Sequence, residues 1–397
     1  MTIVEFFDKD AIENIISSLI CNPDKVVLVG DNTKAMTKAI ARYEKILENH
    51  GVSVEFKTVS INRNDLEGIV DALMDLLAEE CELTIDLTGG DDLYLVAAGI
   101  VYNSHPPCVQ LHRFNMNKDA FYDCDADGNV IASSSDGLAL TIDENIAAYG
   151  GRVIYENETS PIVTHKWNFT DEVVEDIDIM WSICCKNLDE WNDLGTHLVS
   201  VGEKTDESNL KLQTTMDKLT EAPKSIKQLE RYGLVSDVKI KDGVVSFECK
   251  SKCVKACIST SGQLLELKTT LVISSLKEDG VNPIATDVMT GVAIGWDDDP
   301  TDEKDVKNEV DVVAMNGLVP IFISCKNGIV EVDELYKLNT VATRFGGKYA
   351  KKILIATDEL GLIKIRAQEM GIEVVDNIGE LGFDHKDVKR KLKNILK

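Results

Sequence analysis

The sequence predicts an α/β protein with more than one domain. Strand and helix patterns alternate three times between residues 26 and 101, and this alternation favours a parallel sheet covered by helices. Near the other end of the chain, acidic and apolar residues alternate over 309–312, before Asn316-Gly317, and an apolar run at 321–323 follows this pair, which is typical of a hairpin turn. The length of 397 residues exceeds what a single hydrophobic core usually holds.

Residues 1–150 are predicted to form the first domain. Its periodic patterns predict strands at 26–29, 52–59 and 83–87, and helices at 34–49, 66–77 and 93–101. In parallel sheets of this kind, ligands bind outside the carboxyl ends of the strands. Two strand-to-helix turns are therefore candidate binding segments, and they span residues 30–36 and 88–92. Glycines let backbone amides approach a ligand there, and helix N-termini attract anions.

Residues 151–257 are predicted to form a helical linker and a small winged-helix-like module. The pattern indicates helix across 170–235, with the last helix ending at Gly233, followed by a hairpin over 238–247 that turns at Asp242-Gly243. Such a module can read DNA, but this helix carries only three basic residues, Lys224, Lys227 and Arg231. A DNA-reading module and a structural or dimer-forming element both remain open.

Residues 258–397 are predicted to form the last domain. In order, the patterns predict a helix from Gly262 to about Glu278, a strand over 287–296, an acidic loop over 297–305, and the hairpin over 308–326. A helix at 332–344, a strand at 351–356, a helix at 362–371, a strand at 373–375 and a basic C-terminal helix at 386–397 follow. The negative charge of the acidic loop makes it a candidate for shielding the hairpin from a negatively charged ligand.

The hairpin carries the residues that most directly suggest chemistry. Asp311 on its first strand and Lys326 at the end of its second are expected to lie side by side. A carboxylate that holds a divalent metal, beside a lysine that orients water or neutralises a phosphate, suits phosphodiester cleavage. Strand alternation places Glu309 on the same face as Asp311. The following helix offers Glu331 and Glu334 as further carboxylates.

Composition narrows the function classes. A net charge of −26 argues against passive adhesion to nucleic acid, because that binding depends on Lys and Arg neutralising phosphates. The ten cysteines show no paired CxxC spacing, so we expect reduced, mostly buried thiols. The N-terminus lacks a signal-peptide pattern and no long apolar run occurs, so we expect a cytoplasmic protein without a membrane segment.

The segment Leu87-Thr88-Gly89-Gly90 and the small-residue helix after it resemble the ligand-binding domain of the CRISPR-associated Rossmann-fold (CARF) sensors. The resemblance implies a homodimer that binds a cyclic oligoadenylate, cyclic tetra-adenylate in particular, across its twofold axis. Carried over to this chain, the pocket is lined by Gly30, Asp31, Asn32, Thr33, Lys34, Thr88, Gly89, Gly90 and Asp91. No G-x-G-x-x-G occurs in the sequence, which disfavours a nicotinamide-dependent enzyme.

The order of elements in the last domain resembles the restriction-endonuclease-like, or PD-(D/E)XK, fold. Together the three parts resemble CRISPR ancillary nucleases that are activated by cyclic oligoadenylate in type III antiviral defence. The resemblance implies Mg²⁺ or Mn²⁺ and a DNA substrate, with RNA as a second candidate. The implied metal ligands are Asp311, Glu266, Glu334 and Glu309, and the implied catalytic residues are Asp311, Lys326, Glu266, Glu334 and Ser324.

Ser324 departs from the family pattern, because an acidic residue is expected at its position. Glu334 or Glu331 is the candidate replacement from the next helix. The alternative is a non-catalytic regulator, in which a nucleotide sensor is coupled to a DNA-binding winged helix and the nuclease domain has lapsed.

Overall fold

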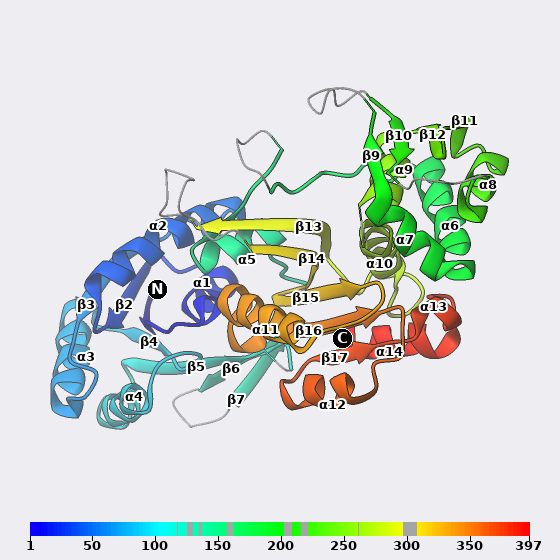
Figure 1. Cartoon of the computed structure of the whole chain (residues 1–397). Helices are drawn as coiled ribbons and strands as arrows, with labels where there is room; N and C mark the ends of the chain where they lie inside the picture. Colours follow the sequence, from blue (N-terminus) through cyan, green and yellow to red (C-terminus); the bar gives the residue numbers. More distant parts are fainter. Residues whose placement is uncertain are drawn as a thin grey trace.

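The computed structural model describes residues 1–116, 118–124, 130–134, 137–156, 162–201, 209–215, 221–260, 262–296 and 308–397. Three β-sheets organise these residues. In Figure 1 the N-terminal sheet is blue to cyan, the C-terminal sheet is yellow to red, and a smaller green module stands at one side. The predicted acidic loop at 297–305 lies outside the described residues.

The N-terminal sheet has seven strands in the order β3-β2-β1-β4-β5-β6-β7. Its first five strands are parallel, and β6 and β7 add to the edge in antiparallel fashion. In chain order the strands are β1 (Thr2–Phe6), β2 (Lys25–Gly30), β3 (Glu55–Ser60), β4 (Leu83–Asp86), β5 (Val109–Asn115), β6 (Ala120–Cys124) and β7 (Val130–Ser134). The helices are η1 (Ala11–Asn14), α1 (Ile16–Cys21), α2 (Thr33–Asn49), α3 (Leu66–Glu80), α4 (Asp92–Ser104) and α5 (Ile142–Ala148).

The doubly wound domain is confirmed, but its central strand was not foreseen. The three predicted strands correspond to β2, β3 and β4, and the three predicted helices correspond to α2, α3 and α4. β1 lies between β2 and β4, so the chain reverses direction across the sheet at β1 and β4. The carboxyl ends of these strands form the switch point at which such folds bind ligands.

The green module joins helices to a four-stranded sheet of order β11-β12-β10-β9. Its elements are α6 (Asp171–Lys186), α7 (Leu188–His197), β9 (Leu198–Ser200), β10 (Lys211–Thr214), α8 (Lys224–Arg231), β11 (Val235–Lys241), β12 (Val244–Cys249) and α9 (Lys252–Ser259). The helix α8 followed by the β11–β12 wing confirms the winged-helix-like prediction. The expectation of helix throughout 170–235 is wrong at β9 and β10, because β10 pairs with the distant strand β12 and this pairing outweighs local pattern.

The C-terminal sheet has six strands in the order β17-β16-β15-β14-β13-β8. The strands are β8 (Gly151–Val153), β13 (Asp287–Trp296), β14 (Asn308–Asn316), β15 (Val319–Lys326), β16 (Lys351–Ala356) and β17 (Glu373–Val375). The helices are α10 (Gln263–Ser275), α11 (Val332–Gly346), η2 (Gly347–Tyr349), α12 (Gly361–Glu369), α13 (Ile378–Leu381) and α14 (Lys386–Leu396). The predicted order of this domain is confirmed, and β14 and β15 meet at the Asn316-Gly317 turn.

The two faces of the C-terminal sheet belong to different cores. Val312 and Ile323 face a core shared with α10, α14 and the green module. Val313 and Phe322 face a core that continues into η1, α1 and α2 of the N-terminal domain. The N-terminal and C-terminal sheets are therefore joined by continuous apolar packing. Among the described residues, no helix has both the length and the apolar character that crossing a membrane requires.

Candidate nuclease site

The hairpin brings Asp311 and Lys326 together. Val312 on β14 pairs with Ile323 on β15, so Asp311 faces Ser324 across the ladder and Lys326 follows two residues on. The Lys326 ammonium lies 3.7 Å from Asp311 Oδ2. Burial lowers the pKa of Lys326, but the carboxylates of Asp311 and Glu334 outweigh it and raise that pKa above its ordinary value. Lys326 therefore remains a cation in this pocket.

Ser324 fixes one oxygen of Asp311. Its hydroxyl donates a hydrogen bond to Asp311 Oδ2 at 3.1 Å, and the amide of Cys325 donates to the same oxygen at 2.6 Å. The Asp311 carbonyl accepts a bond from the Thr290 hydroxyl. Ser324 thus orients the Asp311 carboxylate from the position where the family pattern has an acid, and Oδ1 of Asp311 is the oxygen left to face the pocket.

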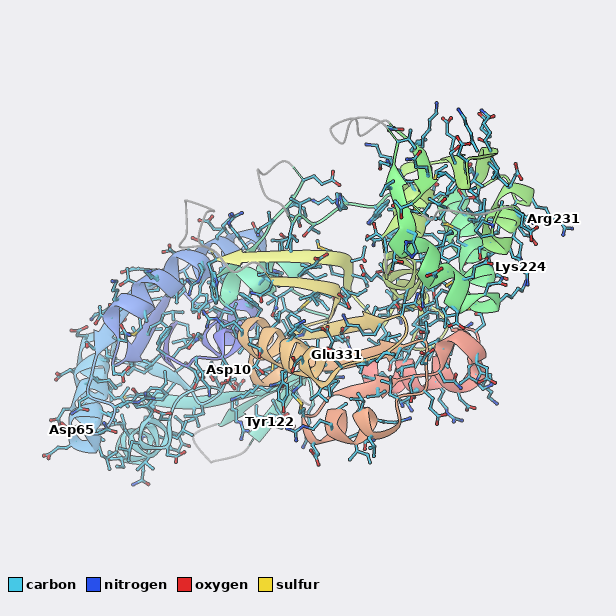
Figure 2. All side chains as sticks on the ribbon, viewed as in Figure 1. Asp10, Asp65, Tyr122, Lys224, Arg231 and Glu331 are labelled. Carbon is cyan, nitrogen blue, oxygen red and sulfur yellow. The ribbon has the colours of Figure 1, made fainter. Side chains whose placement is uncertain are left out.

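Glu334 reaches the lysine from the first turn of α11. Its Oε2 lies 2.9 Å from Lys326 Nζ, and its Oε1 lies 2.7 Å from Lys337 Nζ. Burial raises the pKa of Glu334, but hydrogen bonds from Lys326 and Lys337 hold it below its ordinary value. Glu331, the alternative carboxylate, is exposed at the N-cap position of α11, and Figure 2 labels it at this end of the helix.

Glu266 and Glu309 complete an acidic group around the same point. Burial raises the pKa of Glu266 to about 8, and the negative charges of Asp311 and Glu309 add to the rise. Burial and the Asp311 charge likewise raise the pKa of Glu309. Glu266 lies in the first turn of α10 and accepts a hydrogen bond from Gln263 at 3.3 Å. Glu266 and Glu309 therefore resist ionisation, chiefly because they are buried and also because negative charge is close.

We call this site the hairpin pocket, and its volume is about 220 Å³. Its lining includes five of the residues expected from sequence, Glu309, Asp311, Ser324, Lys326 and Glu334. Oxygen ligands of this kind suit a hard divalent cation such as Mg²⁺ or Mn²⁺. The acids Glu266, Glu309 and Asp311 fit such an ion, because its positive charge would offset the burial and the repulsion that raise the pKa values of Glu266 and Glu309. Lys337 also lines the pocket and was not singled out from the sequence.

The other candidate segments meet at the carboxyl ends of β1, β2 and β4, which we call the switch-point edge. Residues 31–34 and Asp91 are exposed there, whereas Gly30 and Gly89 are buried in packing. Asn32 caps α2 by accepting a bond from the Ala35 amide. Thr88 donates a hydrogen bond to Asp86 and accepts one from the amide of Phe114. The side chains of Asn32 and Thr88 therefore hold the turns in shape.

Arg63 is the cation at this edge that sequence reasoning missed. It lies in the loop after β3 and forms an ion pair with Asp91, and its Nε lies 3.6 Å from Asp31 Oδ2. Both carboxylates belong to the predicted ligand segments. Little in the sequence indicates that Arg63 belongs to this edge, because it is 28 residues from Asp91 and is not part of any motif.

A comparison with known protein families finds a match in the part of the chain that holds the hairpin pocket. Residues 253–395 match the family model described as "Card1-like, endonuclease domain". This part of the chain is therefore similar to the endonuclease domain that the family model describes. It contains Glu266, Glu309, Asp311, Lys326 and Glu334, so every charged residue of the proposed catalytic group falls within the match. No curated protein matches the sequence of the chain.

Two solved structures share the fold of nearly the whole chain. Protein VC1899 from Vibrio cholerae has a TM-score of 0.73 at 17% identity, covering 99% of this chain and 97% of that one. Can2 from Sulfobacillus thermosulfidooxidans, solved in complex with cyclic tetra-adenylate, has a TM-score of 0.71 at 15% identity, covering 100% and 97%. These likenesses fit the predicted layout of a CARF-like domain followed by an endonuclease-like domain.

Proposed function

We propose that this protein is a metal-dependent nuclease that cyclic tetra-adenylate activates and that acts in type III CRISPR antiviral defence. The observation that carries the proposal is the hairpin pocket inside the Card1-like endonuclease domain, where Lys326 contacts Asp311 and Glu334. The proposed activator is cyclic tetra-adenylate, the ligand with which the similar protein Can2 was solved. The proposed substrate is DNA, with RNA as a second candidate.

The proposed roles follow from the contacts. Asp311, Glu266 and Glu309 would hold Mg²⁺ or Mn²⁺, with Glu334 as a further ligand if it leaves Lys326. The ion would supply an activated water and stabilise charge on the phosphate. Lys326 would donate to a phosphate oxygen and neutralise developing charge. Ser324 and the Cys325 amide keep the Asp311 carboxylate in one orientation while this happens.

The proposed activator site is the switch-point edge. Arg63 and Lys34 would bind phosphates there, and the amides of residues 88–91 at the start of α4 would add neutral donors. Because Arg63 is paired with Asp31 and Asp91, a phosphate would have to replace these carboxylates. The exposed acids would then face ribose hydroxyls, adenine amines or water.

We further propose that the protein is a homodimer whose partner docks on α4. Leu95, Val96 and Ile100 are 38%, 49% and 42% exposed. Val96 and Ile100 lie four residues apart and so face the same side of the helix, with Leu95 beside Val96, and together they form one apolar stripe. Gly99, within the stripe, has no atom near the place of a side chain. The stripe begins directly after the Thr88–Asp91 turn, so a second copy there would bring two switch-point edges together.

The direct test is cleavage of supercoiled plasmid and of single-stranded RNA with Mn²⁺, each with and without cyclic tetra-adenylate. Cleavage that requires both metal and activator is the expected outcome. Calorimetry on the same preparation measures activator binding independently of cleavage.

The regulator remains the second candidate because Ser324 replaces the expected acid. Tight activator binding and ligand-dependent, salt-sensitive DNA binding, with no products in Mg²⁺ or Mn²⁺, would favour it. The winged-helix-like module offers little charge for this role: Lys224 and Arg231 lie on its outer side (Figure 2), and Lys227 is paired with Glu221 at 2.6 Å.

A further inference from the structure

Three acidic residues lie where the CARF domain meets the endonuclease domain. Asp8, Asp10 and Glu13 follow β1, and their carboxylate oxygens lie within 4.8 Å of one another. Asp10 and Glu13 are 3% and 2% exposed. Figure 2 labels Asp10 beside α1, close to α11 of the endonuclease domain. Buried carboxylates need partners, and theirs come from both domains.

On the CARF side, the cluster holds the Gly89–Gly90 turn. The amide of Gly90 donates a hydrogen bond to Asp8 Oδ2 at 3.2 Å. A side chain on Gly89 would approach Glu13 Cβ and Asp8 Cβ to 3.2 and 3.3 Å. Gly90 has φ of +98° and lies against Phe6, where a Cβ would come within 2.7 Å. The turn and the acidic cluster are therefore in direct contact, and movement of one displaces the other.

On the endonuclease side, the cluster holds the segment after α11. The Lys348 amide donates to Asp10 Oδ1 at 2.8 Å, and the Lys348 ammonium donates to Glu13 Oε2 at 2.8 Å. The Tyr349 hydroxyl donates to the other oxygen of Glu13. Gly347 has φ of +62°, and a Cβ there would lie 2.1 Å from Asp10 Oδ1, so only glycine allows this approach.

These hydrogen bonds disfavour a bound cation in the cluster, because they use most of its carboxylate oxygens. Both oxygens of Asp8 and of Glu13 and one oxygen of Asp10 already accept hydrogen bonds. The Lys348 ammonium already supplies positive charge beside Glu13. A contact between domains explains the cluster more fully than a metal site does.

Helix α11 connects this junction to the hairpin pocket. Glu334 lies in its first turn and Gly346 is its last residue, a separation of about 18 Å at the helical rise per residue. The helix packs on β15, the strand that carries Lys326. The Phe345 carbonyl accepts a buried hydrogen bond from Asn145 at 2.8 Å. A displacement at Lys348 is therefore carried along a stiff element to Glu334.

We propose that Asp8, Asp10 and Glu13 transmit occupancy of the switch-point edge to the hairpin pocket through α11. This inference rests on the proposed function. In the structure, Glu334 holds Lys326 at 2.9 Å, so Lys326 is engaged by a carboxylate. Ligand at the Gly89–Gly90 turn displaces Asp8, the Lys348 contacts shift, and α11 moves Glu334 away from Lys326. Lys326 is then available to a phosphate.

The variants that test this lie in the endonuclease domain and touch neither proposed site. Lys348→Met and Tyr349→Phe remove the two side-chain contacts to Glu13, and Lys348→Arg retains the charge. Tyr336→Phe is the matched control on α11, because it removes the hydrogen bond that Arg366 of α12 donates to the Tyr336 hydroxyl. Lys364→Met is the second control, because it removes an ion pair to Asp376 within the same domain. Thermal melting establishes that each variant is folded.

We expect Lys348→Met and Tyr349→Phe to lower the ratio of activated to basal cleavage by roughly 5- to 100-fold, the range of typical coupling between sites. Basal cleavage stays at the wild-type rate, and cyclic tetra-adenylate binds at least as tightly because it no longer has to shift the nuclease. Lys348→Arg and both controls keep the wild-type ratio. An unchanged ratio in both folded test variants overturns the proposal.

A failure of the proposed function gives a different experimental result from a failure of this inference. If the wild-type protein binds the activator but does not cleave, hydrogen exchange of residues 340–350 replaces cleavage as the readout. An activator-dependent change in exchange there, lost in Lys348→Met, supports transmission in a lapsed nuclease. No change in the wild-type protein overturns it. If the activator does not bind, both proposals fall.

Discussion

In and beside the hairpin pocket, Glu266, Glu309 and Asp311 are close enough for their charges to interact, and Lys326 is their nearby cation. At the switch-point edge, by contrast, Asp31 and Asp91 share the guanidinium of Arg63. The first group carries excess negative charge in a partly buried site, and two of its members have raised pKa values. The second is paired and exposed. The first site therefore favours a cation, whereas the second becomes an anion site only when an anion replaces its carboxylates.

The largest expected effect is in the hairpin pocket. Lys326→Met should reduce cleavage roughly 10²–10³-fold, because it removes a charged donor aimed at the phosphate. Asp311→Asn should cause a comparable loss by weakening metal binding. The measurement is plasmid cleavage under single-turnover conditions, with activator binding measured in parallel. Lys337→Met, which also removes a bond to Glu334 but is 72% exposed, should lose far less. Cleavage by Lys326→Met at the wild-type rate would contradict the role assigned to Lys326.

The next largest effect is expected at the switch-point edge, where the carboxylates are paired with Arg63. Arg63→Gln should weaken binding of cyclic tetra-adenylate by roughly 10- to 100-fold, the value of a hydrogen bond between charged groups. Calorimetry measures it directly. Arg366→Gln is the control, because Arg366 is also exposed and paired with a carboxylate, Glu369, but lies in the endonuclease domain. Equal affinities for the two variants would show that Arg63 only neutralises Asp31 and Asp91.

A third prediction concerns pH and the crowded acids. The unfolded chain loses the Glu266 proton near the ordinary pKa of 4.5, whereas the folded site keeps it until about 8. Rising pH therefore favours the unfolded state across this window. Without metal, the free energy of unfolding should fall between pH 5 and pH 8 by up to a few kcal/mol, as measured by urea unfolding.

Glu266→Gln should remove most of that fall, while Glu331→Gln, at an exposed position on α11, should leave it in place. Mn²⁺ at pH 8 should stabilise the wild-type protein more than Glu266→Gln, because the ion offsets the ionised carboxylate. A wild-type stability that rises steadily from pH 5 to pH 8 would rule out the raised pKa of Glu266.

The smallest expected effect sharpens the comparison at the switch-point edge. Asp91→Asn removes the ion pair between Asp91 and Arg63. It also removes a negative charge that would repel the phosphates of the activator. Because both groups are about half exposed, the pair contributes only up to about 1 kcal/mol. Affinity for cyclic tetra-adenylate should therefore rise by about two- to fivefold in calorimetry at low salt, and the gain should shrink as salt increases. A loss of affinity would mean that Asp91 itself binds the activator.

The parts of the fold that local chemistry determines were predictable. Asn316-Gly317 marks the place of the hairpin, so its existence follows from sequence. The two-residue loop is Gly317-Leu318, because Asn316 pairs with Val319, and this pairing sets the register that places Asp311 opposite Ser324. Strand alternation then places Glu309 on the same side as Asp311. A carboxylate from the helix after the hairpin was expected at the site, with Glu331 and Glu334 as the two options, because only packing of α11 on β15 decides between them.

The features that were not predicted from the sequence depend on contacts between distant segments. β1 is short and has Glu5 in its centre, yet Glu5 is 1% exposed and accepts a hydrogen bond from Ser18 at 3.1 Å. A buried glutamate does not look like a core residue in sequence, so the central strand was missed, and with it the Asp8, Asp10 and Glu13 cluster. Arg63 was missed for the same reason, because its partners lie elsewhere in the chain.

The apolar core that continues from α2 into the face of β15 has a consequence for how such proteins change over evolutionary time. Two domains joined by a flexible tether can be exchanged between genes as separate cassettes. Here, separating them would expose the Val313 and Phe322 face of the sheet to water, which costs roughly 1.5–3 kcal/mol for each large apolar side chain uncovered. The two halves should therefore melt in a single cooperative transition, and their sequences should be inherited together.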